Sequence, residues 1–246
     1  MTSTPLTSKN RPFAAFDIDG TLIRWQLYHS IADTLARLGH IEPKLHKTIK
    51  DARMIWKNRS GEFSDYERQL IDIYDKTIIR LERRQFEDAA QAVFDEYKDQ
   101  VYTYTRDLIA ELKKKNYLLF AVSGSQAEIV AKIAGYYGFD DYIGSSYKYK
   151  NGRFTGEKQI AAHRKDKALT QLVRKHSVTF KGSIAVGDSQ SDIAMLEMVE
   201  QAIAFNPEKQ LFTYAASKGW KIVVERKNMV YQLIRKGGDY ELAETN

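Results

Sequence analysis

The chain has 246 residues, of which 43% are hydrophobic, so it is long enough for one large domain or for a core with an inserted second unit. It contains no cysteine, which excludes disulfides, zinc–thiolate sites and a thiol nucleophile and fits a reducing compartment. The net charge of +6 favours anionic substrates such as phosphates.

The sequence carries no signal for secretion, a membrane span or nucleic-acid binding. The first dozen residues lack the apolar run of a secretory signal, and nowhere do about 18 apolar residues follow one another. The densest basic run, Lys113–Lys115, ends a predicted helix, where cations complement the helix dipole. We therefore expect a cytoplasmic protein with neither a nucleic-acid nor a membrane partner, and we leave its oligomeric state open.

The first predicted strand, Phe13–Phe16, is followed at once by Asp17, Asp19 and Thr21. A short uninterrupted apolar run is typical of a buried strand in a parallel sheet. Ligands of open α/β sheets bind just beyond the carboxyl ends of such strands, which puts the two aspartates where chemistry usually occurs. Because an Asp-x-Asp pair is also common in loops and helix caps, its assignment depends on the rest of the chain.

Residues 24–103 show helical periodicity and almost no strand signal. Four segments repeat apolar residues at helical spacing, beginning near Leu27, Leu45, Leu70 and Phe86. We predict an all-helical cap over residues 24–103, inserted into a core made of residues 1–23 and 104–246.

From about Tyr104 onward, predicted helices and strands alternate, which favours a parallel sheet covered on both faces. The expected strands are 117–122, 183–186, 202–205 and 221–224, and the expected helices are 106–115, 126–137, 165–175 and 192–199. Asn151-Gly152 predicts a two-residue hairpin turn, and the polar tail after Gly237 is expected to fray. The predicted fold class is α/β, a Rossmann-like parallel sheet core with helices on both faces plus the helical cap.

Ser123-Gly124-Ser125 comes directly after the predicted strand that ends at Val122. A hydroxyl and a small residue at this position can hold phosphate oxygens, together with backbone N–H groups of the next helix. The alternative is that the serines, Ser125 in particular, cap that helix.

Two further clusters are Lys167, within a predicted helix, and Asp188 with Asp192, after the strand 183–186. Alone, the lysine reads as a surface charge and the carboxylates as an acidic first helical turn. Combined with Asp17 and Asp19, these clusters indicate a metal-dependent phosphoryl-transfer enzyme that uses an aspartate nucleophile.

The order of these clusters resembles the haloacid dehalogenase-like hydrolase superfamily, whose motifs are Asp-x-Asp, Ser or Thr, Lys, and Gly-Asp-x-x-x-Asp. The early helical insertion and the hairpin around Asn151-Gly152 resemble the phosphoserine-phosphatase-like branch. The resemblance implies that Asp17 is the nucleophile and Asp19 the general acid and base. It also implies a small phosphorylated substrate whose phosphoryl group Ser123, Gly124 and Lys167 hold.

The same resemblance implies a Mg²⁺ cofactor bound by Asp17, Asp188 and the backbone carbonyl of Asp19. Asp192 would then orient water ligands or the lysine. Thr21 would fix the geometry of the first loop through its hydroxyl, and the alternative is a plain structural role.

The cap region departs from phosphoserine phosphatases. Gln26 stands where those enzymes carry a Glu that recognises the substrate ammonium, and Arg68 is only a nearby candidate for their carboxylate-binding arginine. Trp25 and Tyr28 are candidate contacts for the substrate. Four functions stay open: a general phosphomonoester hydrolase, a phosphoserine phosphatase proper, a phosphotransferase or mutase, and a phosphate-binding regulatory module without catalysis.

Overall fold

The computed structural model describes residues 11–61 and 63–245 and divides the chain into two compact units. Unit 1 contains the described residues of Met1–Trp25, Tyr97–Ser145 and Ile160–Asn246. Unit 2 contains those of Gln26–Glu96 and Ser146–Gln159. Within the described part of the chain, no helix is both long and apolar enough to cross a membrane.

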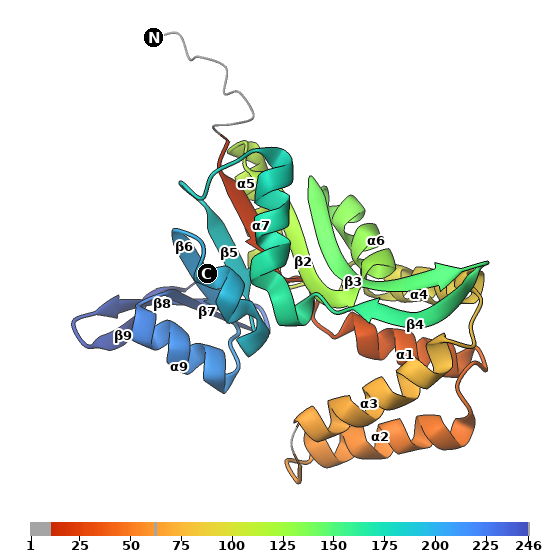
Figure 1. The fold of residues 1–246 in the computed structure, drawn as a ribbon. Coiled ribbons are helices and arrows are strands. Elements are labelled where there is room, and N and C mark those ends of the chain that lie inside the picture. Colours follow the sequence, from red (N-terminus) through yellow and green to blue (C-terminus); the bar gives the residue numbers. More distant parts are fainter. Residues whose placement is uncertain (1–10, 62, 246) are drawn as a thin grey trace. The chain divides into compact units, whose positions relative to one another are not determined.

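Unit 1 is built on a twisted sheet whose strand order is β3-β2-β1-β5-β6-β7-β8-β9 (Figure 1). The strands from β3 to β7 are parallel to their neighbours, and β8 and β9 add an antiparallel edge. The bounds are β1 Phe13–Phe16, β2 Leu118–Gln126, β3 Asp141–Lys150, β5 Ile184–Gly187, β6 Gln201–Phe205, β7 Lys221–Arg226, β8 Met229–Lys236 and β9 Asp239–Thr245.

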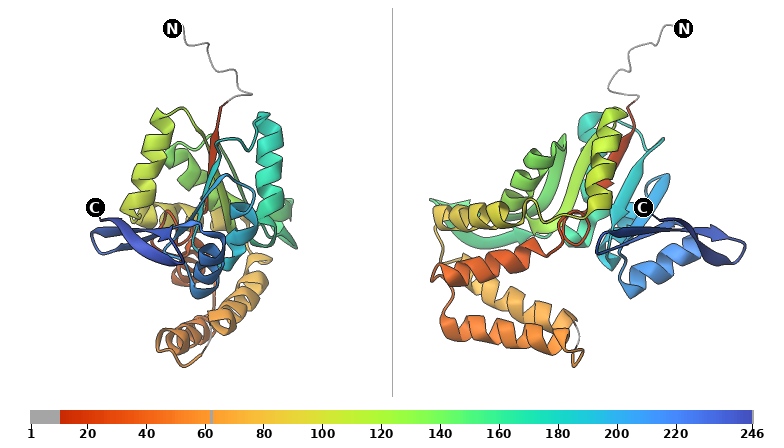
Figure 2. Two further views of the ribbon diagram at one scale, coloured as in Figure 1. Left: turned by 90° about the vertical axis from the view of Figure 1, so that its left-hand side faces the viewer. Right: turned by 180° about the vertical axis from the view of Figure 1, so that it is seen from behind.

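Helices cover both faces of the central strands of this sheet (Figure 2). On one face lie α5 (Thr103–Lys114) and α6 (Ala127–Tyr137), and on the other lie α7 (Lys165–His176), α8 (Ile193–Leu196) and α9 (Lys209–Lys218). A continuous apolar core joins the second group of helices to the strands, with Phe13, Phe120 and Leu169 fully buried in it. The predicted α/β class with helices on both faces is confirmed.

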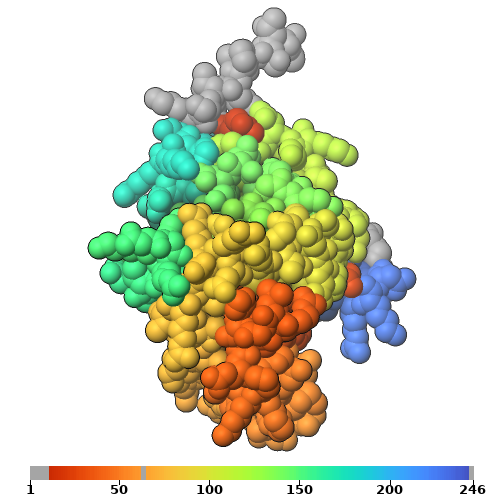
Figure 3. Space-filling model, turned by 90° about the vertical axis from the view of Figure 1, so that its right-hand side faces the viewer, coloured from red at the N-terminus to blue at the C-terminus, as the bar shows by residue number. Residues whose placement is uncertain are grey.

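Unit 2 is not purely helical. Its helices are α1 (Leu27–Arg37), α2 (Pro43–Lys57), α3 (Phe63–Ile78) and α4 (Arg83–Tyr97), and a hairpin made by the end of β3 and β4 (Arg153–Gln159) belongs to the same unit. The hairpin segment lies beside the α3–α4 segment in Figure 3. The reason is apolar burial, since Phe154 is 4% exposed and its ring centroid lies 5.6 Å from that of Phe86.

The predicted hairpin turn is confirmed. Asn151 and Gly152 both have positive φ, +52° and +77°, as a two-residue turn with the twist of its strands requires. The predicted fraying of the tail is wrong, because β9 pairs with β8 from Asp239 onward. The hydroxyl of Tyr240 also donates a hydrogen bond to the carbonyl of Trp220 at 2.7 Å.

We predict that Phe154→Ala destabilises unit 2 by about 3–5 kcal/mol, because a buried aromatic ring is lost and its space is only partly refilled. Denaturant unfolding, combined with hydrogen exchange of the α4 amides, measures the loss. Lys150→Ala, an exposed change on the same hairpin, serves as the control. A loss below about 1 kcal/mol for Phe154→Ala would show that the hairpin contributes little to the packing of unit 2.

Candidate active site

The predicted chemistry gathers at one edge of the sheet of unit 1. Strands β1, β2 and β5 are parallel neighbours, so their carboxyl ends meet. Asp17 follows β1, and its backbone N–H continues the ladder by donating to the carbonyl of Val186 at 2.9 Å. Ser123 lies in the last part of β2, and Asp188 follows β5 directly. The topology thus brings residues more than 100 positions apart in the sequence to one place.

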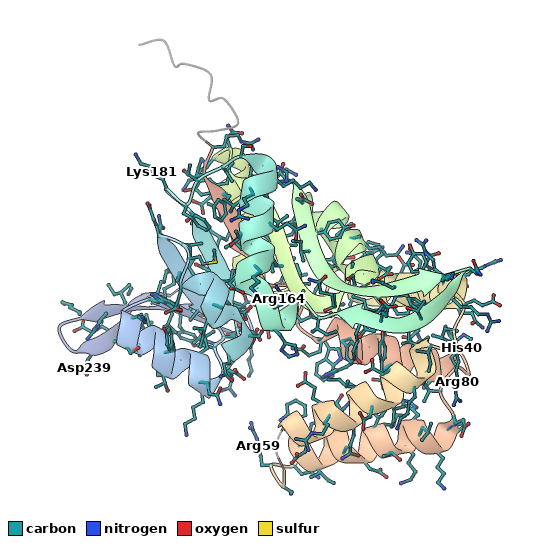
Figure 4. The ribbon with its side chains drawn as sticks, viewed as in Figure 1. His40, Arg59, Arg80, Arg164, Lys181 and Asp239 are labelled. Carbon is teal, nitrogen blue, oxygen red and sulfur yellow. The ribbon has the colours of Figure 1, made fainter. Side chains whose placement is uncertain are left out.

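A buried lysine at the start of α7 links two of the carboxylates. The Nζ of Lys165 donates to Asp17 Oδ1 at 2.6 Å and to Asp192 Oδ1 at 2.5 Å, and the residue is 2% exposed. Exposed Arg164, labelled in Figure 4, marks the amino-terminal end of α7 beside it.

Lys167, for which this contact was predicted, is exposed on α7, so the lysine assignment is corrected to Lys165. Side chains two residues apart on an α-helix point about 200° away from each other around its axis, so only one of the two lysines can face the site. The sequence held the signal for the right choice. The core-facing positions of α7, Ala168, Leu169, Leu172 and Val173, lie three, four, seven and eight residues after Lys165 and so share its face.

Asp192 fixes the loop after β5. It is fully buried, and its Oδ2 accepts hydrogen bonds from the backbone N–H of Asp188 at 3.1 Å and of Ser189 at 3.0 Å, and from the Ser189 hydroxyl at 3.0 Å. A Cβ at Gly187 would lie 2.5 Å from the Cβ of Asp192, so the close approach requires glycine. With Oδ1 bound to Lys165, Asp192 orients the lysine as well as the loop.

Two serine hydroxyls hold Asp19. The hydroxyl of Ser123 donates to Oδ2 at 2.7 Å and that of Ser125 donates to Oδ1 at 3.0 Å. Ser125, read from the sequence as a possible helix cap, therefore serves the site, and the N-cap of α6 is Gln126. Residues two apart in a strand point to the same side, so the extension of β2 through Gln126 explains why both serines reach Asp19. Between them, Gly124 packs closely, since a Cβ there would lie 2.9 Å from that of Ala162.

The first loop is fixed through its backbone. The hydroxyl of Thr105 donates to the carbonyl of Thr21 at 2.8 Å, whereas the buried hydroxyl of Thr21 has no partner among the described residues. The described residues therefore favour the plain structural role of Thr21. Gly20 has a φ of +78°, and a Cβ on it would lie 2.1 Å from Oδ2 of Asp188. Only glycine lets this carboxylate lie against the loop.

The carboxylates are crowded in a buried place. The pKa of Asp17 is raised to about 7: burial raises it most, the charge of Lys165 lowers it, and the charges of Asp192 and Asp19 raise it. Burial, with Asp17 and Asp192 nearby, also raises the pKa of Asp188 well above its ordinary value. Burial lowers the pKa of Lys165, but the two carboxylates raise it by more, so the lysine stays charged. The single charge of Lys165 does not neutralise this group of carboxylates, whereas an additional bound cation would.

Carboxylate oxygens of Asp17, Asp188 and Asp192 lie within 4.8 Å of one another. Hard oxygen donors of this kind suit Mg²⁺, which binds through one or two carboxylates and keeps several waters. Because both oxygens of Asp192 are already engaged, Asp17 and Asp188 are the side chains that fit direct ligation.

The predicted specificity residues have different surroundings. Trp25 and Gln26 are half-buried, and the Gln26 side chain makes no capping bond to α1. Tyr28 packs within unit 2, with its ring centroid 4.3 Å from that of Tyr74. Arg68 is exposed, with Nη2 3.7 Å from Asp65.

The half-buried Arg53 of unit 2 is a residue that the sequence did not single out. Arg53 binds Asp33 through both terminal nitrogens, at 2.7 and 3.1 Å, and donates from Nε to the Tyr66 hydroxyl at 2.8 Å. These contacts make Arg53 a structural link between α1, α2 and α3.

Comparison with known proteins gives related sequences and folds. The chain is 27% identical to a putative hydrolase of Mycobacterium leprae over 136 residues, which are 54% of this chain and 45% of the relative. It is 24% identical to a phosphoserine phosphatase of Methanocaldococcus jannaschii over 200 residues, 80% of this chain and 86% of that protein. The first of these alignments thus spans less than half of the relative's length.

A solved structure of a phosphoserine phosphatase with an analogue of its phospho-aspartyl intermediate matches with a TM-score of 0.60 at 20% identity, over 89% of this chain and 95% of that chain. At this identity, the match shows a shared fold. The family model of haloacid dehalogenase-like hydrolases matches residues 14–197, from β1 past the loop of Asp188 and Asp192. The chain therefore belongs to the haloacid dehalogenase-like hydrolase family.

Proposed function

We propose that this protein is a Mg²⁺-dependent phosphomonoester hydrolase that acts through an aspartyl-phosphate on Asp17. The observation that carries the proposal is the position of Asp17: it lies at the end of β1, bound to a buried lysine, with Asp19 two residues away and held by two hydroxyls. A module that only bound phosphate would need neither a nucleophile nor a positioned second carboxylate.

Asp17 would attack phosphorus, and hydrolysis of the resulting acyl phosphate would release inorganic phosphate. A carboxylate and a phosphomonoester dianion repel each other. Lys165 supports the attack by placing a positive charge 2.6 Å from Asp17 Oδ1, and it would stabilise the phosphoryl oxygens as their charge redistributes.

Mg²⁺ would be held by Asp17, Asp188 and the backbone carbonyl of Asp19. When bound, it supplies the remaining positive charge that the carboxylate nucleophile and the phosphoryl group require.

Asp19 would protonate the leaving oxygen and later accept a proton from the attacking water. Its oxygens are bound by Ser123 and Ser125 in this structure. A serine hydroxyl has one proton to donate, so Ser123 cannot serve Asp19 Oδ2 and a phosphoryl oxygen together. A bound phosphoryl group that accepts the hydrogen bond of the Ser123 hydroxyl would leave Asp19 Oδ2 free to act on the leaving group. The Ser125 hydroxyl would still hold Asp19 Oδ1 in place.

The substrate we propose is a small phosphorylated metabolite. The name of the M. jannaschii relative makes phosphoserine phosphatase the second candidate. Gln26 is neutral and Arg68 is exposed beside Asp65, which favours a substrate other than an amino-acid zwitterion. Transfer to an acceptor alcohol, in place of water, is tested by adding such alcohols to the assay.

Metal dependence and turnover are tested together. Purified protein should release inorganic phosphate from small phosphomonoesters with Mg²⁺, lose this activity in excess chelator, and regain it with Mg²⁺ but not Ca²⁺, whose longer bonds and higher coordination number spoil in-line geometry. Asp188→Asn should lower kcat/KM about a hundredfold or more, because a metal contributes several kcal/mol. Asp107→Asn, an exposed change on α5, should leave it unaltered. Full turnover in chelator would overturn the metal assignment.

A panel that includes phosphoserine compares the two candidate substrates.

Substitution of Lys165 and of Lys167 separates the roles of the two lysines. Lys165→Met should lower kcat/KM about 100- to 1,000-fold, because a positioned donor to the developing charge is removed. It should also lower stability, since two buried carboxylates lose their counter-charge. Lys167→Met should change both quantities little, and Lys165→Arg checks that a positive charge preserves the fold. Equal losses for the two methionine variants, measured with melting curves alongside kinetics, would contradict the role given to Lys165.

A further inference from the structure

Ser145 is a buried serine on β3 whose hydroxyl makes two hydrogen bonds to the backbone around the active site. The residue is 1% exposed. Its Oγ donates to the carbonyl of Gly124 at 2.6 Å and accepts from the N–H of Ala161 at 3.0 Å. Gly124 lies between the two serines that hold Asp19, and Ala161 precedes the short helical turn that leads into α7. One side chain therefore joins two segments that carry site residues.

The pairing of β2 with β3 explains why this contact is needed. Between Val122 and Gln126, β2 has three residues where β3 has one, Gly144. Such a bulge interrupts the hydrogen bonds between the strands, so a partly buried carbonyl within it needs another partner. The hydroxyl of Ser145 supplies that partner to Gly124.

The shape of this bulge sets the direction of the serine pair. The Ser123 hydroxyl donates to Asp19 Oδ2 at 2.7 Å and accepts from the N–H of Ser125 at 2.9 Å. The Ser125 hydroxyl donates to Asp19 Oδ1 at 3.0 Å. When a phosphoryl oxygen takes the hydrogen bond of Ser123, the contact from Ser125 remains, and its direction depends on the Gly124 peptide. A shift of that peptide would turn Asp19 away from the leaving oxygen.

The N–H of Ala161 fixes where the proton of Ser145 points. A hydroxyl has one proton and two lone pairs, and the Ala161 N–H occupies a lone pair, so the proton is left for the Gly124 carbonyl. The position of Lys165 has its own support, from its two carboxylate partners and from the apolar face of α7. The effect of Ser145 should therefore reach the site through Asp19.

We propose that Ser145 is a positioning residue that aligns Asp19 for proton transfer to the leaving group, acting through the Gly124 peptide and the serine pair. This inference rests on the proposed phosphatase function.

The test compares kcat/KM for two esters in wild type and in Ser145→Ala. Glycerol 3-phosphate has an alkyl leaving group that needs a proton, whereas p-nitrophenyl phosphate releases a stable anion without one. Ser145→Ala should lower kcat/KM for glycerol 3-phosphate about 10- to 100-fold, the size of a small misplacement of a catalytic group. The value for p-nitrophenyl phosphate should fall by less than about threefold.

Two further variants test the route of the effect. Ser145→Cys keeps the shape but replaces the hydroxyl with a weak donor and acceptor, and it should change the ratio of the two esters as Ser145→Ala does. In a Ser125→Ala background, Ser145→Ala should change that ratio little, because residues that act through one another are not additive. The ratio is unaffected by any misfolded fraction, since both esters meet the same active molecules.

Ser183 provides the matched control. It is fully buried at the amino-terminal end of β5, and its hydroxyl likewise donates to one carbonyl, that of Phe180, and accepts from one N–H, that of Glu200. Ser183→Ala should lower Tm about as much as Ser145→Ala and leave the ratio of the two esters as in wild type. Ser146→Ala, an exposed change beside Ser145, should alter neither quantity.

Four outcomes contradict the proposal. Unchanged turnover of glycerol 3-phosphate in Ser145→Ala removes the role, and an equal loss on both esters shows that Ser145 does not act through proton transfer. A shift of the ratio in Ser183→Ala would make the effect one of general stability. A wild type that hydrolyses only the aryl ester leaves no alkyl leaving group for Asp19 to protonate. A wild type that releases phosphate from neither ester contradicts the proposed function itself and, with it, this inference.

Discussion

The site depends on the charge of one buried lysine. Lys165 is 2% exposed and binds Asp17 and Asp192, both buried. Desolvation of these groups is expensive, and removing one member of such a cluster commonly costs about 3–5 kcal/mol. The arrangement holds because every buried oxygen of Asp192 accepts a hydrogen bond and because α7 anchors the lysine through its apolar face. A further acid, Asp188, leaves the cluster short of positive charge, and that shortage is what a divalent cation would fill.

The sheet makes this density of charge possible. Parallel strands bring three loops to one edge without any of them crossing another, and two glycines permit the closest approaches. Gly20 gives room to Asp188, and Gly187 gives room to Asp192. The helices on the faces bury the apolar side chains of the central strands, among them Phe13, Phe120 and Val122.

The sequence predicted the strands β1, β2, β5, β6 and β7, the order of the motifs and the hairpin turn because each rests on local pattern: short apolar runs, polar residues directly after them, and Asn-Gly. It predicted neither β8 nor β9. The prediction failed where the direction of a side chain within a helix or strand decides which residues it contacts. Lys167 and Lys165 are both near the start of α7, and only the helical face, shared with Leu169 and Leu172, tells them apart. Ser125 was read as a cap because β2 was expected to stop at Val122, whereas pairing with β3 carries it to Gln126. Long-range contacts were not visible either: Phe154 joins the hairpin to α4 across about 70 residues, and Tyr240 ties the tail to Trp220.

The central claim is that Asp17 becomes phosphorylated during turnover. Acid quenching during turnover of an ester with a labelled phosphoryl group, followed by peptide mass mapping, tests it most directly. The account predicts a hydroxylamine-sensitive acyl phosphate on the peptide that contains Asp17, which decays as phosphate is released and is absent in Asp17→Asn. Steady release of phosphate with no label on the protein, or with label on another residue, would contradict it.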